Sequence, residues 1–93
     1  MTEHFRDNET SNRFELDVDG TIAFVTYRKA PGTITLEHTE VPQELGGKGI
    51  GSKLARATLD AVRVQGRQLT VECEFIQGYM KKHPEDNDLL AAS

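Results

Sequence analysis

Apolar and polar residues alternate along the first half of the chain, and this two-residue period predicts β-strands. In the segment 14–18 (FELDV) apolar residues alternate with charged ones, which is typical of a half-buried strand. Asp19-Gly20 follows and favours a tight hairpin turn, because both residues tolerate a positive φ. Residues 21–29 are rich in β-branched and aromatic side chains and predict the return strand. A third strand is expected over 33–40, which completes an antiparallel meander.

After residue 42 a helical pattern replaces the alternation. Apolar residues recur every three or four positions, which predicts an amphipathic helix. Its apolar stripe consists of Ile50, Leu54, Ala57 and Ala61. Gly66 is placed to end this helix, because glycine adopts a left-handed conformation at little cost. Residues 68–74 (QLTVECE) alternate again and predict a strand, and a second helix is expected over 75–82, before Pro84.

The predicted order of elements is β-β-β-α-β-α, a mixed α+β fold around a small mixed sheet. The last strand returns through a helical crossover, which is long enough to place it parallel to the strand at 33–40. A chain of 93 residues predicts one compact domain over 1–93. Its polar ends, residues 1–11 and 87–93, are expected to be flexible.

Composition and charge narrow the classes of protein that the chain can represent. The net charge of −4 argues against nucleic-acid binding, because phosphate contacts need a basic surface. No apolar run is long enough to span a membrane and no secretory signal is visible, so the cytoplasm is the expected compartment. One cysteine and three dispersed histidines predict neither a disulfide nor a metal site. So short a chain buries a modest core, and we expect a monomer or a homodimer.

The segment 46–53 (GGKGIGSK) stands directly before the first predicted helix and indicates anion binding. A P-loop requires G-x-x-x-x-G-K-[ST], but Ser52 occupies the lysine position and Lys53 comes one residue late. A dinucleotide-binding fingerprint places its glycines against a strand end, whereas residues 41–45 intervene here. A loop that wraps a pyrophosphate fits better, because free amides and the helix dipole favour an anion at a helix N-terminus. A glycine-rich connection that binds nothing is the open alternative.

The segment 41–62 (VPQELGGKGIGSKLARATLDAV) resembles the acetyl-coenzyme-A loop and helix of the GCN5-related N-acetyltransferases. The resemblance extends to LEHTEVP before it and to VECEFIQGYMKKHPE after it. Together these segments resemble the compact, YjdJ-type acetyltransferase-like proteins over residues 14–84. The resemblance implies a minimal acyl-coenzyme-A N-acyltransferase fold, and its order of elements agrees with the predicted one. It also implies acetyl-coenzyme A or coenzyme A as the cofactor.

One position departs from the signature of that superfamily, which is Arg or Gln, two residues, Gly, one residue, then Gly or Ala. This chain carries Gly46 at the first position, while Gly47, Gly49 and Gly51 stay in register. The departure removes one side-chain contact to the cofactor's diphosphate, so we expect the amide cradle to remain and binding to be weaker. Additional positive charge is expected from Lys48, Lys53 and Arg56.

The resemblance further implies where the cofactor lies. In the superfamily, the strand before the glycine loop and the strand after the first helix diverge, and the pantetheine arm lies between them. The matching residues Thr39, Glu40 and Val41 would offer backbone groups to the arm, and the Val41 amide would polarise the thioester carbonyl. The expected cofactor-binding set is Thr39, Glu40, Val41, Gly46, Gly47, Lys48, Gly49, Ile50, Gly51, Ser52, Cys73 and Tyr79.

Three side chains are candidates for the chemistry. His38 follows Ile34 and Leu36 at a spacing of two residues, so we expect its side chain on the apolar face of the strand. There it would act as a base or be a half-buried histidine that bonds to a backbone group. Cys73 is expected at the end of the strand 68–74, near His38, as an acetyl acceptor, a cofactor contact or a small buried residue. Tyr79 would protonate or hold the departing thiolate, or serve as a core aromatic.

Acidic residues border the expected cleft, and they favour a cationic amine as the acceptor or simply face water. They are Glu37, Glu40, Glu72 and Glu74. The leading hypothesis is an N-acetyltransferase in which a small-molecule or protein amine attacks acetyl-coenzyme A directly. The alternative is a non-catalytic module that binds coenzyme A or an acyl-coenzyme A as a sensor or carrier. A third hypothesis is a small interaction protein with a vestigial loop.

Overall fold

Five strands, two α-helices and two short 3-10 helices form residues 2–91, the part of the chain that this computed structural model describes. The elements are β1 (Glu3–Asn8), β2 (Arg13–Val18), β3 (Thr21–Ala30), β4 (Thr33–Glu40), η1 (Gln43–Leu45), α1 (Ile50–Gln65), β5 (Gln68–Val71), α2 (Glu74–Lys82) and η2 (Pro84–Leu89). The strands lie side by side in the order β1-β2-β3-β4-β5. Pairing is antiparallel from β1 to β4 and parallel between β4 and β5. The predicted mixed α+β fold and the parallel last strand are therefore confirmed.

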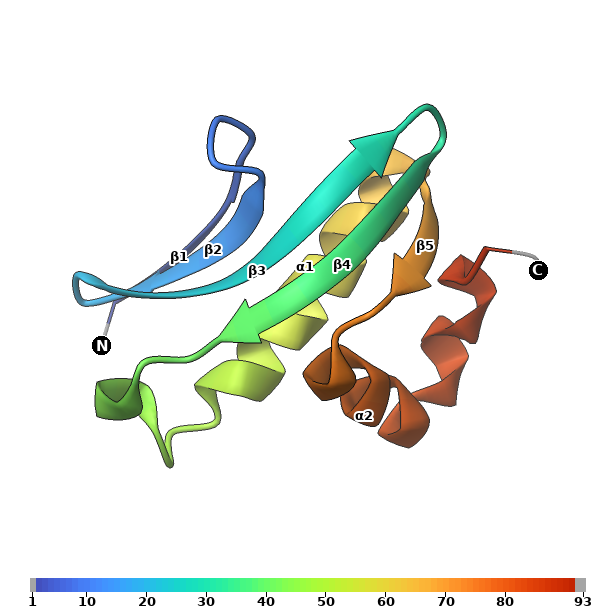
Figure 1. Cartoon of the computed structure of the whole chain (residues 1–93). Helices are drawn as coiled ribbons and strands as arrows, with labels where there is room; N and C mark the ends of the chain where they lie inside the picture. Colours follow the sequence, from blue (N-terminus) through green and yellow to red (C-terminus); the bar gives the residue numbers. More distant parts are fainter. Residues whose placement is uncertain (1, 92–93) are drawn as a thin grey trace.

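Both helices pack on one face of the sheet, and Figure 1 shows α1 crossing behind β3 and β4 with α2 below the end of β5. The alternation of each strand decides which side chains meet the helices. Phe14 and Leu16 of β2 and Ile34 and Leu36 of β4 are buried in the same core as Leu54 of α1. No helix among residues 2–91 covers the opposite face, which we call the open face.

Helix α1 begins and ends at glycines with a left-handed backbone. Gly49 is its N-cap at φ 69°, and Gly66 its C-cap at φ 68°. The Gly66 amide donates to carbonyls of the last turn, which satisfies groups that a helix end leaves open. The predicted end of the helix is confirmed. The predicted strand over 68–74 is too long, because β5 stops at Val71.

The first strand was not predicted. Residues 1–11 were expected to be flexible, whereas the structure places Glu3–Asn8 in β1, paired along its length with β2. Phe5 stacks on Phe14 with ring centroids 5.8 Å apart, which joins β1 to the core. Flexibility was also expected over 87–93, whereas residues 87–89 lie in η2 and Leu90 forms a bridge with Leu69. The same expectation for Met1 and residues 92–93 lies outside the described residues.

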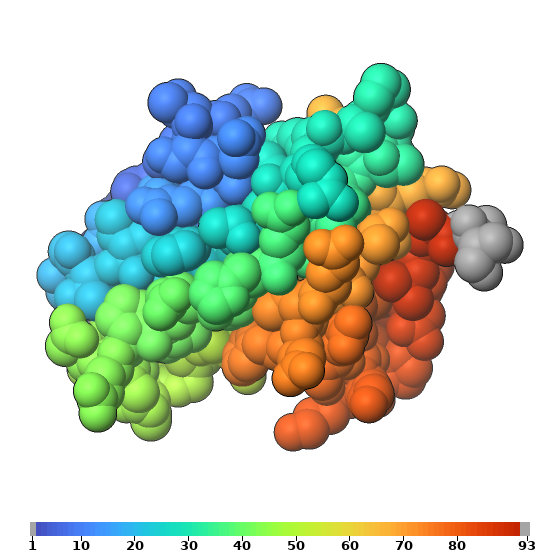
Figure 2. Space-filling model, viewed as in Figure 1, coloured from blue at the N-terminus to red at the C-terminus, as the bar shows by residue number. Residues whose placement is uncertain are grey.

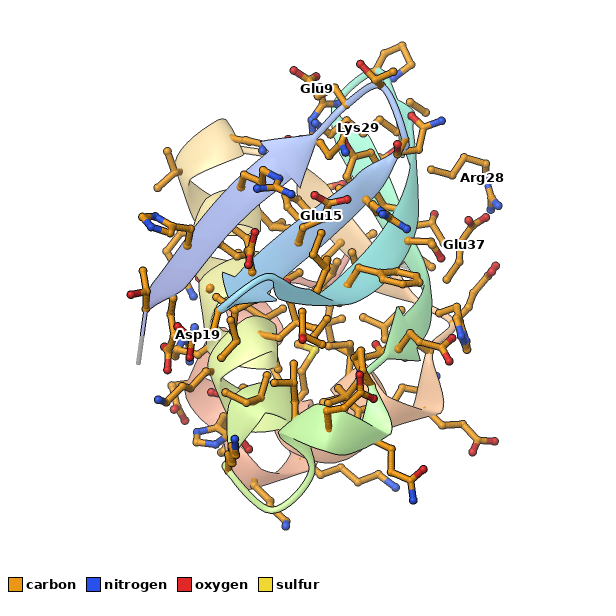
Figure 3. The ribbon with its side chains drawn as sticks, turned by 90° about the vertical axis from the view of Figure 1, so that its left-hand side faces the viewer. Glu9, Glu15, Asp19, Arg28, Lys29 and Glu37 are labelled. Carbon is orange, nitrogen blue, oxygen red and sulfur yellow. The ribbon has the colours of Figure 1, made fainter. Side chains whose placement is uncertain are left out.

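A buried carboxylate on the open face also holds β1. Burial raises the pKa of Glu15, but hydrogen bonds from Arg13, Arg6 and Asn8 outweigh it and hold that pKa below its ordinary value. Figure 3 shows Glu15 beside the ribbons of β1 and β2. A buried charge is tolerated only where hydrogen-bond donors of the protein replace its hydrating water. Two of the three donors to Glu15, Arg6 and Asn8, belong to β1. Sheet pairing and this ion cluster therefore act together on β1.

A second buried carboxylate, Asp86, fixes η2 against α1. Arg56 donates to both of its oxygens at 2.8 Å, and Arg63 adds a bond of 3.2 Å. The hydrogen bonds from Arg56 hold the pKa of Asp86 below its ordinary range, although burial opposes them. The guanidinium carbon of Arg56 also lies 6.0 Å from the centroid of the Tyr79 ring, so this ion cluster lies beside α2.

The close approach of α1 and α2 depends on a glycine in the first turn of α1. A Cβ on Gly51 would lie 2.6 Å from the Phe75 ring, which is too close for any real contact. Gly78 in α2 differs, since a Cβ there would meet no atom of residues 2–91 within 4 Å.

Asp86→Asn is expected to lower the free energy of unfolding by about 1–3 kcal/mol at neutral pH, because two arginines lose a buried charged acceptor. Asp60→Asn removes an exposed partner of the same Arg56 and should cost less than about 1 kcal/mol. Urea denaturation across pH measures both effects. A carboxyl group whose pKa is lower in the folded than in the unfolded protein stabilises the fold at pH values above its unfolded-state pKa. That stabilisation is lost as the pH falls through the folded-state pKa. A cost of Asp86→Asn that persists at acid pH would refute this origin.

Gly78→Ala is expected to raise the free energy of unfolding by about 0.5–1 kcal/mol, because alanine favours a helix over glycine and has room there. Gly51→Ala should bring no such gain, since Phe75 must move. Thermal or urea denaturation should compare Gly51→Ala in the wild-type background with Gly51→Ala in a Phe75→Ala background. With the Phe75 ring removed, the alanine at position 51 should increase stability as it does at position 78. Equal stabilisation by Gly51→Ala and Gly78→Ala in the wild-type background would contradict the contact.

Candidate functional site

The glycine loop presents a run of free backbone donors. Leu45 and Ile50 are buried on either side of it and anchor it to the core. Gly47 has φ 76° and Gly49 φ 69°, values that L-residues rarely adopt. Among the described residues, the backbone amides of residues 47–52 have no hydrogen-bond acceptor. The first amide of this region with an acceptor belongs to Lys53, which donates to the Gly49 carbonyl at 3.1 Å.

The electrostatics of this loop favour an anion. The amides lie at the N-terminus of the sixteen-residue helix α1, whose first turn holds no acidic residue. Lys48 lies exposed within the loop. Two other expected sources of positive charge are engaged elsewhere, since Lys53 binds Glu3 at 2.7 Å and Arg56 is held by Asp86. The donors that the loop presents are therefore mainly backbone amides, and of the three expected sources of side-chain charge Lys53 and Arg56 are engaged elsewhere.

The strands β4 and β5 separate next to this loop. Their parallel pairing begins where Thr33 lies beside Gln68 and ends where Leu36 lies beside Val71. One further bond follows, from the Glu72 amide to the Leu36 carbonyl at 2.9 Å. Beyond it the chain turns into α2, so no strand among residues 2–91 lies beside the last residues of β4 on this edge. Figure 1 shows the two strands diverging toward α2. We call this opening the fork.

A β-bulge at the fork changes the side to which His38 points. Thr26 pairs with His38 but Tyr27 pairs with Leu36, so Glu37 is an extra residue in β4. The alternation of side chains between the two faces of the sheet therefore shifts by one residue after Leu36. As a result the side chain of His38 is 63% exposed. The expectation that His38 lies on the apolar face is therefore wrong. Its Nε2 lies 3.0 Å from a carboxylate oxygen of Glu40.

The bulge brings Thr39, in place of His38, to the helix side of the sheet. The Thr39 hydroxyl lies 2.9 Å from the thiol sulfur of Cys73, and either atom can be the donor. Cys73 is buried, but it is the N-cap residue of α2 and not the end of a strand. The expected pair of His38 and Cys73 is thus replaced by a hydroxyl–thiol pair at the fork, with His38 on the other side of β4.

Tyr79 lies on the side of α2 that faces the first turn of α1. Its ring stacks on His83 with centroids 4.1 Å apart. It lines a shallow groove together with Ser52 and Phe75. The structure therefore groups Tyr79 with the glycine loop, while the contact of Cys73 is with Thr39.

Arg28 changes the acidic border that the sequence predicted. It binds Glu37 at 2.5 Å and approaches Glu72 to 3.8 Å. Figure 3 shows the side chains of Arg28, on β3, and Glu37, on β4, directed toward one another. Two of the four predicted acidic residues are thereby partly neutralised, and Glu40 is paired with His38.

Sequence reasoning missed Thr39 as a partner of Cys73, Phe75 as the residue over Gly51, and Arg28 as a counter-ion. The aromatic residue at 75 was a visible signal, but nothing local to the sequence indicated the bulge that places Thr39. Within residues 2–91, no cluster of His, Cys, Asp or Glu has the arrangement of a metal site. No helix of this part of the chain is long and apolar enough to cross a membrane.

Comparisons with known proteins find relatives that match about half of this chain. Protein NATD1 of Xenopus tropicalis is 40% identical over 52 residues, which cover 56% of this chain and 48% of that protein. Protein NATD1 of Homo sapiens is 41% identical over 51 residues, which cover 55% of this chain and 45% of that protein. The chain therefore spans about half the length of the curated relatives that it matches.

A solved structure extends the similarity to nearly the whole fold. The NMR solution structure of a GCN5-like protein from Staphylococcus aureus superposes with a TM-score of 0.71 at 28% identity, covering 97% of this chain and 89% of that one. The family model described as GCN5-related N-acetyl-transferase matches residues 13–89, which include the glycine loop, the fork and α2. By its sequence and its fold, this chain belongs to the GCN5-related N-acetyltransferase family.

Proposed function

We propose that this chain transfers an acetyl group from acetyl-coenzyme A to an amine. The observation that carries the proposal is the run of amides at residues 47–52, which have no acceptor among the described residues. A diphosphate matches such a set of donors, because its oxygens are charged acceptors and the helix dipole favours negative charge there. Membership of an acetyltransferase family supports the same cofactor.

The unpaired edge of β4 extends this site from the loop into the fork. Backbone groups of Thr39, Glu40 and Val41 would bind the pantetheine arm in the direction of a missing strand, since β5 no longer occupies that edge. The cofactor-binding residues proposed in the loop are Gly46, Gly47, Lys48, Gly49, Ile50, Gly51 and Ser52. When bound, acetyl-coenzyme A supplies the acetyl group as a reactive thioester.

Residues on the two sides of β4 would have different roles. His38 lies on the open face, and Glu40 orients its imidazole through Nε2, so that Nδ1 is left to take a proton from an ammonium acceptor. On the helix side, the Thr39 hydroxyl and the Cys73 thiol share a hydrogen bond where the fork begins. We assign this pair to positioning of the thioester end. Tyr79, whose ring lies toward the loop, is assigned to the cofactor.

The acceptor would reach the fork from the open face. Glu72 and Glu40 give that approach a negative border even though Arg28 offsets part of it. A cationic amine on a small molecule or on a protein fits this border.

One observation favours a second candidate function, a non-catalytic module that senses or carries an acyl-coenzyme A. His38 is mostly exposed, and no element among residues 2–91 covers the open face beside it. Catalytic proton transfer is most effective where water is excluded. The two functions share the cofactor site and differ only in turnover.

Gly46→Arg is expected to bind coenzyme A about tenfold more tightly than the wild type, because it restores a charge-assisted contact worth about 1.5 kcal/mol. The backbone of Gly46 is extended, at φ −63° and ψ 146°, and accepts a side chain after a small shift of the Gln43 carbonyl. Isothermal titration measures the affinity, and Gly46→Leu controls for the backbone change. Equal affinities of the Arg and Leu variants would refute the assigned register.

His38→Ala is expected to lower acetyl transfer to an amine panel by about a hundredfold or more, with coenzyme A affinity unchanged, because only a proton acceptor is removed. His4→Ala, which alters another strand histidine on β1, should leave turnover unchanged. A steady-state assay with acetyl-coenzyme A and a set of di- and polyamines provides the rates. Full turnover in His38→Ala would contradict the assignment of His38 as the base. Binding of coenzyme A by the wild type without any acetyl transfer would favour the non-catalytic sensor or carrier.

A further inference from the structure

A hollow lies beside the end of β5, between α2 and η2, and we call it the outer hollow. Its volume of about 360 Å³ falls within the range of small-molecule sites, about 300–1,000 Å³. Figure 2 shows, on the right of the molecule, the red residues of η2 lying against the orange residues of β5 and α2. Gln77 and Lys81 line the outer hollow from the opposite side of α2 to Tyr79, so it is separate from the groove beside the glycine loop.

Apolar side chains from three elements form most of the outer hollow. They are Val71, Met80, Pro84 and Leu90. Leu90 is 42% exposed, yet its backbone is fixed on both sides. Its own amide donates to the Asn87 carbonyl at 3.1 Å, and the next amide, that of Ala91, donates to the Leu69 carbonyl at 2.8 Å. An exposed leucine held in this way offers a preformed apolar surface, which a ligand gains free energy by covering.

The backbone beside the outer hollow is already hydrogen-bonded. Gln77 Nε2 donates to the Val71 carbonyl at 2.9 Å, at the last residue of β5. One residue pair further back, the Leu69 carbonyl accepts the Ala91 amide. An apolar group can therefore lie against this edge without leaving either carbonyl unpaired, which would carry a large desolvation cost.

The charge at the outer hollow is positive. Lys81 lines it, is exposed, and forms no ion pair with any of residues 2–91. None of the described residues that line the hollow is acidic. The acidic residues Asp86 and Asp88 of η2 are bound by arginines of α1. An anionic group at Lys81 would therefore gain an ion pair, and the side-chain amide of Asn87 offers a further donor.

We propose that the outer hollow binds a small carboxylate that carries a short aliphatic chain. The chain lies against Met80 and Leu90, and the carboxylate pairs with Lys81. One ammonium group and one amide match a singly charged anion, whereas a doubly charged phosphate would lose more hydration beside so many apolar side chains. The inference does not rest on acetyl transfer, because the outer hollow and the glycine loop lie on opposite sides of α2.

Titration of the ¹⁵N-labelled full chain with hexanoate, hexanamide and acetate, without coenzyme A, tests the proposal through the backbone amide resonances. Hexanoate should shift the resonances around the outer hollow saturably at millimolar concentration. Hexanamide has the same chain without the charge, and should bind about threefold to fivefold more weakly, the range of an exposed ion pair. Acetate lacks most of the chain, and should bind about tenfold or more weakly than hexanoate.

Two pairs of variants assign the binding to these side chains. Lys81→Gln should weaken hexanoate about threefold to fivefold and leave hexanamide unchanged. Lys82→Gln is the matched control, because the neighbouring lysine lines the groove on the other side of α2, and it should change neither. Leu90→Ala should weaken hexanoate and hexanamide alike, by about threefold to tenfold. Val64→Ala removes another exposed apolar side chain, from a different hollow, and should change neither.

Three results would overturn the proposal. The first is the absence of any saturable shift around the outer hollow with hexanoate. The second is equal affinity of the wild type for hexanoate and hexanamide, since the lysine would then contribute nothing. The third is equal weakening of hexanoate by Lys81→Gln and Lys82→Gln, because the attraction would then come from the overall charge of α2. Thermal denaturation of each variant confirms that it folds.

Discussion

The proposed chemistry of this chain depends on the backbone amides of residues 47–52, which have no acceptor among the described residues. A helix leaves its first amides without acceptors, and most proteins cap them with a side chain. Here the cap residue is Gly49, which has no side chain to offer, and the preceding turn adds further free donors. Buried residues on both sides fix the loop, so the donors are held in position before any ligand arrives. An anion such as the proposed diphosphate would satisfy these donors.

The bulge in β4 gives the fork two chemically different sides. One extra residue at Glu37 directs His38 to the open face and Thr39 toward the helices. A histidine–carboxylate pair is thereby separated by the thickness of one strand from a hydroxyl–thiol pair. Because β5 ends at the same level, the edge of β4 between these pairs is open. An acyl donor held along that edge and an amine on the open face would approach the same point from different directions.

How much of this could be predicted from the sequence depends on whether the cause is local. The glycine loop, α1 and its end at Gly66 were predictable, because turn geometry and helical periodicity are properties of neighbouring residues. β1 was not, since its segment EHFRDN has a single strongly apolar residue and depends on pairing with β2 and on the buried Glu15. The bulge had no local signal, so the face of His38 was predicted wrongly. The sequence placed Cys73 on the strand because it continues the alternating pattern of residues 68–74, whereas in the structure it is the buried N-cap residue of α2.

The most direct test of the central claim is an NMR titration of the ¹⁵N-labelled chain with coenzyme A, followed through the backbone amide resonances. If residues 47–52 hold the diphosphate, their amide protons should show the largest shifts, toward the values of strongly hydrogen-bonded donors, with smaller changes along the open edge of β4. Saturating coenzyme A that leaves those six resonances unmoved, or that perturbs only the open face of the sheet, would contradict the account.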